Sequence, residues 1–337
     1  MKQELLELLL TQASVSGEEF ALQDRLETYV KERIKGAECV RDRIGDGIYA
    51  VCAGKSGKKI LLSAHIDEIG LAVTTATSDG FLKVTNVGGV KALTYPGHSV
   101  AIHTDNGIVY GSVAADGDAM KKEGFSAKDL RIDIGAATKE EALSLVSPGD
   151  TVVQDTSVRE LANGRVSARG LDDKTGVYVM IEALRRAAEE TVNDLYAAAT
   201  AGEETSKHGA RWAAERIQPD EALIVDVTFT SDYDGMRDAE WGEISLGGGP
   251  AICINPICDK EMTRRLREIA EEKQIPYQKE VSAGKSCTDA DEIHFAGPGI
   301  PVALVSVPLR YMHSPAEVAD TKDLEWCIQL LAEYMKR

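Results

Sequence analysis

The sequence has 337 residues, of which 43% are hydrophobic and 28% are charged, and its formal net charge is −17. This composition is typical of a globular protein with a full apolar core. The excess of acidic residues argues against a nucleic-acid partner and against docking on anionic lipid, because both need a basic face. A chain of this length forms one large domain or, more usually, two.

The cysteines and the N-terminal segment favour a cytoplasmic location. The six cysteines are scattered and contain no CxxC pair, which predicts buried free thiols in a reducing compartment. The apolar run over residues 1–12 is interrupted by Glu4 and Glu7. It therefore predicts a first helix and neither a signal peptide nor a membrane span. No run in the sequence approaches the length that crosses a membrane.

The N-terminal region predicts helix followed by strand. Ser16 and Glu19 have the spacing of a capping box, and apolar residues at helical spacing follow over residues 22–34. A turn at residues 45–47 (GDG) precedes two predicted strands, IYAVCAG (48–54) and KKILLSAHID (58–67), and the second has His65 near its end.

Between about residue 71 and residue 164, short β-type runs and turns replace this pattern. Asn106-Gly107 between alternating apolar residues is a strong hairpin signal. One helix is expected in this stretch, at residues 139–145. We interpret residues 71–164 as a small β-barrel-like insert in an α/β domain formed by residues 1–70 and 165–337.

The remainder of the chain returns to the α/β pattern. Helices are expected at residues 175–186, 207–217, 261–273 and 322–335, and strands at residues 194–200, 222–227 and 301–307. Strands that alternate with helices predict a sheet covered on both faces.

Five polar clusters lie at the boundaries of these elements: AHIDE (64–68), LDD (171–173), GEE (202–204), VD (225–226) and MHS (312–314). Four of them follow an apolar strand, and LDD opens a helix. In an open α/β sheet, ligands collect at the carboxyl ends of the strands, so these segments are expected to converge on one crevice.

The residue types in the clusters suit a two-metal site. Two imidazoles and several carboxylates are ligands that zinc, cobalt or manganese accept, and the absence of cysteine favours an open catalytic site. One bridging carboxylate and two further ligands per ion would make five residues. Of the adjacent Glu203 and Glu204, one would bind metal and the other would accept a proton from water. Each cluster alone is a weak signal, and the combination carries the hypothesis.

With these motifs the sequence resembles the dinuclear-metal aminopeptidases that form tetrahedral dodecamers, a family of the zinc exopeptidase clan in which some members have been labelled endoglucanases. The resemblance covers essentially the whole chain. The matching stretches are SAHIDEIG (63–70), IDIGAATKEEA (132–142), SARGLDDKTG (167–176), the Glu203-Glu204 pair, LIVDVT (223–228), LGGGP (246–250) and residues 286–325, which contain PLRYMHSPAEV.

The resemblance implies a role for each cluster. The implied metal ligands are His65 and Asp226 for one ion, Glu204 and His313 for the other, and Asp172 as the bridge between them. Glu203 is implied to be the general base, and Asp67 is implied to hold the His65 imidazole. The implied fold is a phosphorylase/hydrolase-like α/β sandwich, with residues 71–164 as a β-barrel dimerisation domain. The implied cofactors are two divalent ions, zinc first, with cobalt or manganese as alternatives. The implied partners are peptide substrates and further copies of the chain, as dimers that assemble into a dodecamer.

Two stretches depart from the family pattern. Thr205-Ser206-Lys207-His208-Gly209-Ala210 stands where Val-Gly-x-Arg-Gly-Ala is usual, and AADGDAM (114–120) replaces a proline-rich stretch. Both leave the implied ligands intact and leave the substrate preference and the details of assembly open. The alternatives are a related metal-dependent deacylase or carboxypeptidase, a glycoside hydrolase such as an endoglucanase, and a non-catalytic assembly protein.

Other polar residues receive a structural interpretation. We expect His98, His103 and His294 to be surface or packing residues, and His208 to be an exposed helix residue. Cys287 is expected to be a buried thiol. The glycines at 247–249 predict a turn where backbone approaches substrate.

Overall fold

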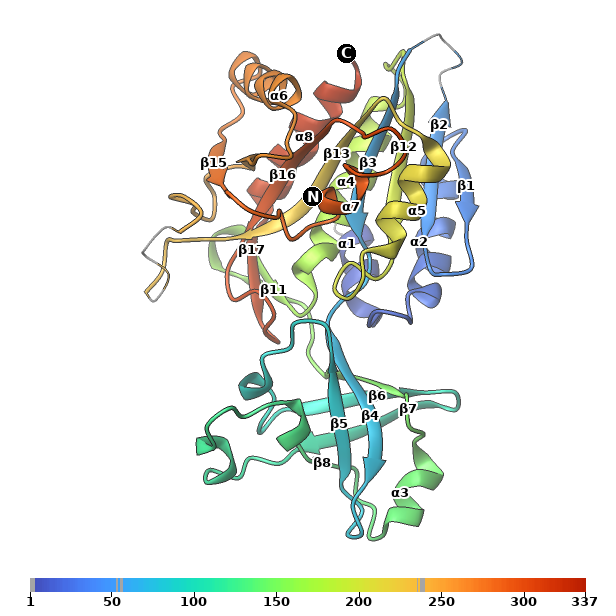
Figure 1. Ribbon diagram of the computed structural model, residues 1–337, viewed down its shortest axis with the longest axis vertical. Coiled ribbons are helices and arrows are strands. Elements are labelled where there is room, and N and C mark those ends of the chain that lie inside the picture. Colours follow the sequence, from blue (N-terminus) through green and yellow to red (C-terminus); the bar gives the residue numbers. More distant parts are fainter. Residues whose placement is uncertain (1–3, 53, 55–56, 235, 237–239) are drawn as a thin grey trace.

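The computed structural model describes residues 4–337 except for residues 53, 55–56, 235 and 237–239. Figure 1 shows a larger α/β body above a smaller β body, joined by a narrow connection. The first three residues of the expected N-terminal helix and residue 53 of the expected strand 48–54 lie outside the described residues.

The larger body is built on an eight-stranded sheet with the order β1-β2-β12-β3-β13-β16-β14-β15. Its strands are β1 (Glu38–Arg41), β2 (Gly47–Cys52), β3 (Lys59–His65), β12 (Asp194–Thr200), β13 (Glu221–Phe229), β14 (Ala251–Ile254), β15 (Gln278–Val281) and β16 (Val302–Leu309). The central strands β12, β3, β13 and β16 run parallel, and β2 and β14 pair antiparallel with β12 and β16. The parallel centre brings four strand ends to one edge of the sheet.

Helices cover both faces of this sheet, as expected for buried parallel strands. The largest apolar core packs one face against α1 (Glu4–Thr11), α2 (Phe20–Arg33), α4 (Leu171–Ala187), α6 (Lys260–Glu272) and α8 (Thr321–Met335). A second core packs the other face against α5 (His208–Ile217) and α7 (Ala290–Ile293). The centre of α4, from Val177 to Leu184, is buried on all sides, which is why it lacks a polar stripe.

The smaller body is a closed barrel in the order β4-β5-β8-β7-β6-β9. Its strands are β4 (Gly70–Ala76), β5 (Leu82–Val87), β6 (Ser99–Thr104), β7 (Gly107–Val113), β8 (Ile132–Asp133) and β9 (Thr151–Gln154), with α3 (Lys139–Leu145) beside them. Short 3₁₀ turns lie at Ala92–Thr94, Ala119–Lys121, Ala127–Asp129 and Ala162–Gly164. The hairpin predicted at Asn106 joins β6 to β7, and Thr104 pairs with Gly107.

A third, three-stranded sheet lies where the chain returns to the larger body. It joins β10 (Arg159–Leu161), β11 (Arg165–Ala168) and β17 (Glu317–Asp320). Strand β10 falls inside the expected insert of residues 71–164 but pairs with β11 and not with a barrel strand. The division of the chain at residues 71 and 164 therefore stays a prediction, and the barrel strands themselves span residues 70–154.

Two local predictions are wrong. Ser16 does not cap α2, because its hydroxyl donates to the carboxylate of Asp67, and Glu19 accepts from the backbone N–H of Gly17 at 2.9 Å. Not all thiols are buried, because Cys52 and Cys287 are exposed, although every described cysteine is free. No helix in the described part of the chain is long and apolar enough to cross a membrane.

Candidate metal centre

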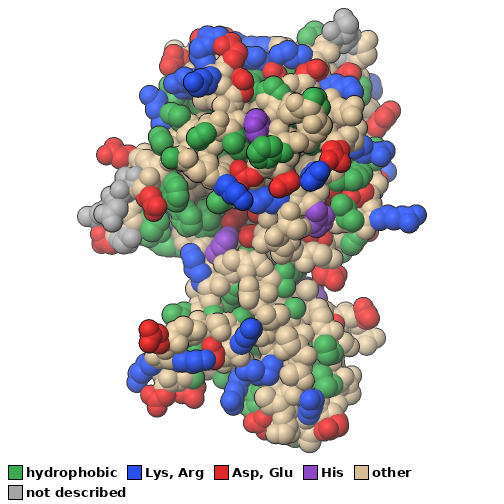
Figure 2. Space-filling view, viewed as in Figure 1, with side chains coloured by type: hydrophobic (Ala, Val, Ile, Leu, Met, Phe, Trp, Pro, Cys, Tyr) green, Lys and Arg blue, Asp and Glu red, His purple; other side chains and the backbone are tan. Residues whose placement is uncertain are grey.

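The polar clusters meet at the edge of the sheet where the parallel strands end. His65 is the last residue of β3, Asp226 lies inside β13, and Glu203 and Glu204 follow β12. Figure 2 shows acidic and histidine side chains gathered just above the waist between the two bodies. The convergence expected from the sequence is thus present, although Asp226 precedes the end of its strand.

One group of possible metal ligands consists of His65, Asp172 and Asp226. One ligand atom from each of the three lies within 4.8 Å of the others. His65 Nε2 is 3.1 Å from Asp172 Oδ1, and all three side chains are buried. An imidazole nitrogen with two carboxylates is a donor set that zinc, cobalt and manganese accept.

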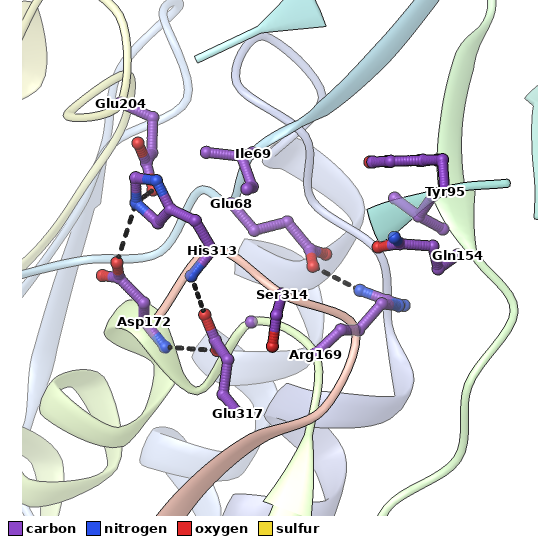
Figure 3. Close-up of a pocket in the computed structure, with 12 residues that line it drawn as sticks. Glu68, Ile69, Tyr95, Gln154, Arg169, Asp172, Glu204, His313, Ser314 and Glu317 are labelled. Carbon is purple, nitrogen blue, oxygen red and sulfur yellow. Dashed lines mark hydrogen bonds and ion pairs between the residues drawn. The ribbon is translucent and has the colours of Figure 1, made fainter. Parts of the chain in front are cut away.

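A second group consists of Asp172, Glu204 and His313, again with ligand atoms within 4.8 Å of one another. His313 Nε2 lies 3.2 Å from Asp172 Oδ2 and 3.4 Å from Glu204 Oε1 (Figure 3). Asp172 therefore belongs to both groups and turns a different oxygen toward each histidine. A carboxylate shared in this way is the arrangement that a two-metal site requires.

Backbone carbonyls hold both imidazoles in the orientation that ligation needs. His65 Nδ1 lies 3.0 Å from the carbonyl oxygen of Asp67, and His313 Nδ1 lies 2.9 Å from that of Gly89. A carbonyl oxygen accepts from an N–H, so these contacts favour a proton on Nδ1 and direct each Nε2 toward the carboxylates, where a cation would bind. Gly89 belongs to the loop after β5, so the smaller body contributes directly to this site.

Asp67 mainly holds the loop that carries the two glutamates. Its carboxylate accepts from the backbone N–H of Glu203 at 3.0 Å and of Glu204 at 3.3 Å, and also from the hydroxyl of Ser16. Asp67 Oδ1 lies 3.5 Å from His65 Nδ1, farther than the backbone carbonyl of the same residue. Its contact with the imidazole is therefore secondary to its contacts with backbone amides.

Glu317 supports the second group, and sequence reasoning missed it. Its two carboxylate oxygens accept from the backbone N–H groups of His313 at 2.7 Å and of Asp172 at 3.2 Å (Figure 3). Burial raises the pKa of Glu317 to about 8. The motif MHSPAE contains this residue, but only the folded loop shows that it ties two candidate ligands together.

Glu68 has a structural role next to the site. Its carboxylate pairs with Arg169 and with the buried ammonium of Lys174, the latter at 2.8 Å, and it accepts from the backbone N–H of Ser14 at 3.0 Å. Burial raises the pKa of Glu68, but Arg169 and Lys174 outweigh that effect and lower it to about 2. Both oxygens are thus committed to protein groups, which leaves Glu68 out of the ligand set.

The stretch that departs from the family pattern contacts the candidate base. The ammonium of Lys207 pairs with the carboxylate of Glu203, a buried side chain. Burial lowers the pKa of Lys207, but Glu203 outweighs that effect and raises it. Glu203 and Lys207 have the i,i+4 spacing of a helical ion pair, but they lie in the turn before α5, and their contact was not predicted from the sequence.

The electrostatics of the site favour added positive charge. Burial raises the pKa of Glu204 to about 7 and raises that of Asp226 well above its ordinary value. Burial lowers the pKa of His313, but Asp172 and Glu204 outweigh it and raise the value to about 11. The carboxylates of the site thus carry more negative charge than the two imidazoles can balance. Both the donor atoms and the charge therefore fit a pair of divalent cations.

A cavity of about 320 Å³ opens onto both groups and onto Glu203. It offers apolar walls beside the polar centre, as binding sites for small molecules commonly do. Cys287 lines this cavity and is exposed, so the expectation of a buried thiol at this position is wrong.

The remaining polar predictions have simpler outcomes. His98 and His208 are exposed, His103 is half-buried, and His294 Nδ1 lies 3.2 Å from the carbonyl oxygen of Ile300. None of these four histidines lines the described part of the cavity.

The glycine turn at residues 247–249 is present, but its amides are already bound. The backbone N–H groups of Gly247 and Gly249 donate to the carboxylate of Asp323 at 2.7 and 2.8 Å. They are therefore not available to a substrate.

Comparison with known proteins agrees with this site. The family model for M42 glutamyl aminopeptidases matches residues 46–330. A putative aminopeptidase from Acetivibrio thermocellus is 37% identical over 323 residues, covering 95% of this chain and 94% of the relative. A lysyl aminopeptidase from Pyrococcus furiosus is 31% identical, covering 97% and 94% of the two chains. The solved TET1 peptidase from Pyrococcus horikoshii, which can assemble into a tetrahedron or a large octahedral shell, is 29% identical, with 98% of both chains covered and a TM-score of 0.85.

The range matched by the family model runs through both bodies of the structure and contains every candidate ligand. The expected α/β exopeptidase fold and peptide-hydrolase activity are confirmed at the level of the family. The chain belongs to the M42 glutamyl aminopeptidase family and is a metal-dependent aminopeptidase.

Proposed function

We propose that this chain hydrolyses the N-terminal peptide bond of peptides at two divalent cations, which His65 and Asp226 hold on one side, Glu204 and His313 on the other, and Asp172 between them. The observation that carries the proposal is the position of Asp172, whose two oxygens face two different histidines at 3.1 and 3.2 Å. Zinc is the first choice for both ions, and cobalt and manganese accept the same nitrogen and oxygen donors.

The cations, when bound, would polarise the scissile carbonyl and lower the pKa of the attacking water. The chain supplies the proton transfers. Glu203 lines the same cavity as both ligand groups, and its carboxylate accepts the proton of the attacking water and then donates it to the leaving amine. Asp67 positions Glu203 through its backbone N–H, at 3.0 Å. The free α-amine of the substrate binds among the acidic side chains of the cavity.

The decisive experiment compares metal content with turnover in a Glu203→Gln variant. Hydrolysis of aminoacyl-anilides is expected to fall by roughly 10²–10⁴-fold, while two ions per chain remain bound, because Gln cannot accept the proton. The matched control is Glu215→Gln, which removes an exposed carboxylate on α5 and leaves turnover unchanged. Near wild-type turnover in Glu203→Gln would remove this residue from its proposed role.

Blocking the substrate separates the aminopeptidase from its nearest alternative. An N-acetylated peptide offers no free amine, so it should resist this enzyme, whereas a deacylase or carboxypeptidase would accept it. A glycoside hydrolase would cleave a glucan without divalent ions. Chelation is expected to abolish all hydrolysis here, so chelator-insensitive cleavage of a glucan would support that alternative.

The proposal extends to the assembly and the location of the protein. We propose that residues 71–164 form a dimerisation domain and that dimers build a dodecamer, as the shell-forming TET1 peptidase assembles from its own chains. Sedimentation of the wild-type protein tests this, and a monomer at micromolar concentration would contradict it. The free cysteines fit a cytoplasmic enzyme, and the net charge of −17 fits the absence of a nucleic-acid partner.

The residue preferred at the substrate N-terminus is not set by membership of the family. The family description names a glutamyl preference, and the relative from Pyrococcus furiosus is named for a lysyl preference. The preference of this chain must therefore come from the side chains that line its own cavity.

A further inference from the structure

The cavity beside the metal centre contains one carboxylate that the proposed mechanism does not use. Glu280 lies on β15 and lines the cavity together with both ligand groups. Its Oε1 accepts from the hydroxyl of Thr228 at 2.8 Å, and its Oε2 accepts from the hydroxyl of Ser306 at 2.7 Å. These hydroxyls hold the carboxylate in one position.

Strand register places this carboxylate close to the metal centre. Thr228 is two residues beyond Asp226 on β13, so both side chains lie on the same face of the strand, about 7 Å apart along the chain. Ser306 on β16 is the register partner of Asp226. The carboxylate that both hydroxyls hold therefore lies beside the same face of the sheet as Asp226, along the same cavity.

Glu280 has no positive partner in the described part of the chain. The contacts that act on its carboxyl group are the hydroxyls of Ser306 and Thr228, and burial raises its pKa. Fully buried glutamates elsewhere in this protein pair with cations, as Glu68 does with Lys174 and Glu221 with Arg265. A carboxylate that is half-buried and held by neutral hydroxyls alone is costly unless a cation comes to it.

The rest of the cavity suits a long aliphatic stem. Its apolar lining includes Val227, Phe229, Trp241, Leu304 and Met312. The methylene groups of a lysine or arginine side chain would lie against such a wall while the charged end reaches a carboxylate. The cavity thus combines an apolar passage with a carboxylate, that of Glu280, which is neither a proposed metal ligand nor the proposed base.

The side chain of Lys285 also lines the cavity, but it is more exposed than Glu280. Lys285 is exposed, so water solvates its ammonium, and attraction to a substrate carboxylate would be screened. An acidic substrate side chain in the cavity would instead meet the less exposed carboxylate of Glu280, where repulsion is stronger. The charge balance inside the cavity therefore favours a basic substrate side chain.

We propose that Glu280 selects peptides with lysine or arginine at the N-terminus, by pairing with the cationic end of that side chain. This inference rests on the proposed aminopeptidase function and names the substrate class of the same site. Glu280 is a specificity residue here, and it takes no part in bond cleavage.

The test is a panel of Lys-, Arg-, Met-, Leu- and Glu-anilides assayed with the zinc-loaded wild type and a Glu280→Gln variant. In the wild type, kcat/KM for Lys and Arg is expected to exceed that for Met and Leu by at least about 10-fold, and Glu is the poorest substrate. In Glu280→Gln, kcat/KM for Lys and Arg falls roughly 100-fold, as when one partner of a buried charge pair is removed, while Met and Leu stay within about 3-fold. The Glu215→Gln control leaves the whole panel unchanged.

Three results overturn the inference. A wild type that prefers Leu or Glu over Lys would refute the basic preference without any variant. The proposed aminopeptidase function would then still stand. An equal loss on every substrate in Glu280→Gln shows a role in holding the fold or the common α-amine. If protein with two bound ions hydrolyses none of the free aminoacyl-anilides, the proposed function is refuted as well.

Discussion

Replacing Gly89 by alanine tests whether the smaller body helps to hold the metal centre. A Cβ at this position would lie 2.9 Å from both Cε1 and Nδ1 of His313. The backbone of Gly89 lies outside the left-handed region, so alanine itself adds no backbone strain. The steric effect on the imidazole is therefore the main consequence of the substitution.

The size of that effect follows from the distances. Carbon atoms in van der Waals contact lie about 3.5–4.0 Å apart, so the His313 ring must move by about 0.6 Å or more. Metal–ligand distances tolerate only about 0.2 Å, and the ring is already tied to Gly89 through Nδ1. We expect the affinity of the group formed by Asp172, Glu204 and His313 for its cation to fall about 10–100-fold.

The measurement is the number of zinc ions per chain after dialysis against buffers of graded free zinc, with kcat/KM measured in parallel. At intermediate free zinc, Gly89→Ala should retain fewer ions and less activity than the wild type. The control is Gly117→Ala, because a Cβ there meets no atom within 4 Å. If Gly89→Ala binds both ions with wild-type affinity and keeps its turnover, the Gly89–His313 contact does not matter to the site.

Three further predictions follow from the described contacts. His65→Ala and His313→Ala should each lose bound metal, measured by elemental analysis, and unchanged metal content would exclude that histidine as a ligand. Asp67→Asn should retain metal but lower kcat roughly 10–100-fold, because an amide cannot accept from both backbone N–H groups of the Glu203 loop; wild-type kcat would refute this. Burial raises the pKa of Asp46 from 3.8 to about 8. Between pH 3.8 and about 8 the folded chain therefore binds more protons than the unfolded chain, and the contribution of Asp46 to stability is lost as pH rises through about 8. The fall in Tm between pH 5 and 8 should be shallower in Asp46→Asn than in the wild type. Identical pH profiles of Tm would contradict the assignment.

The candidate ligands could be predicted because each belongs to a local pattern that the fold preserves. An apolar strand followed by a polar cluster predicts a side chain at the edge of a parallel sheet, and His65 and Asp226 lie on neighbouring strands whose register matches Ser63 with Ile224. The residue types then limit the chemistry. Resemblance to the family supplied the division of roles, which spacing alone leaves open.

The supporting contacts could not be predicted, because they join segments that no sequence pattern relates. Gly89 and His313 are separated by 224 positions, and their contact depends on how the barrel docks beside the sheet. Strand β15, which carries Glu280, has the sequence QKEV and is only half-buried, so it lacks the apolar periodicity that identifies a strand. Ser16 satisfied a capping pattern locally, but its hydroxyl bonds to Asp67, a tertiary partner.

The shared position of Asp172 has a thermodynamic consequence for loading the site. An ion that enters beside His65 orients the same carboxylate that the other ion needs beside His313, so the two occupancies carry a coupling free energy. That coupling is reciprocal, and a substitution confined to one triad changes the affinity of the other. Titration with a divalent ion should therefore follow a two-step isotherm whose steps cannot be assigned to independent sites.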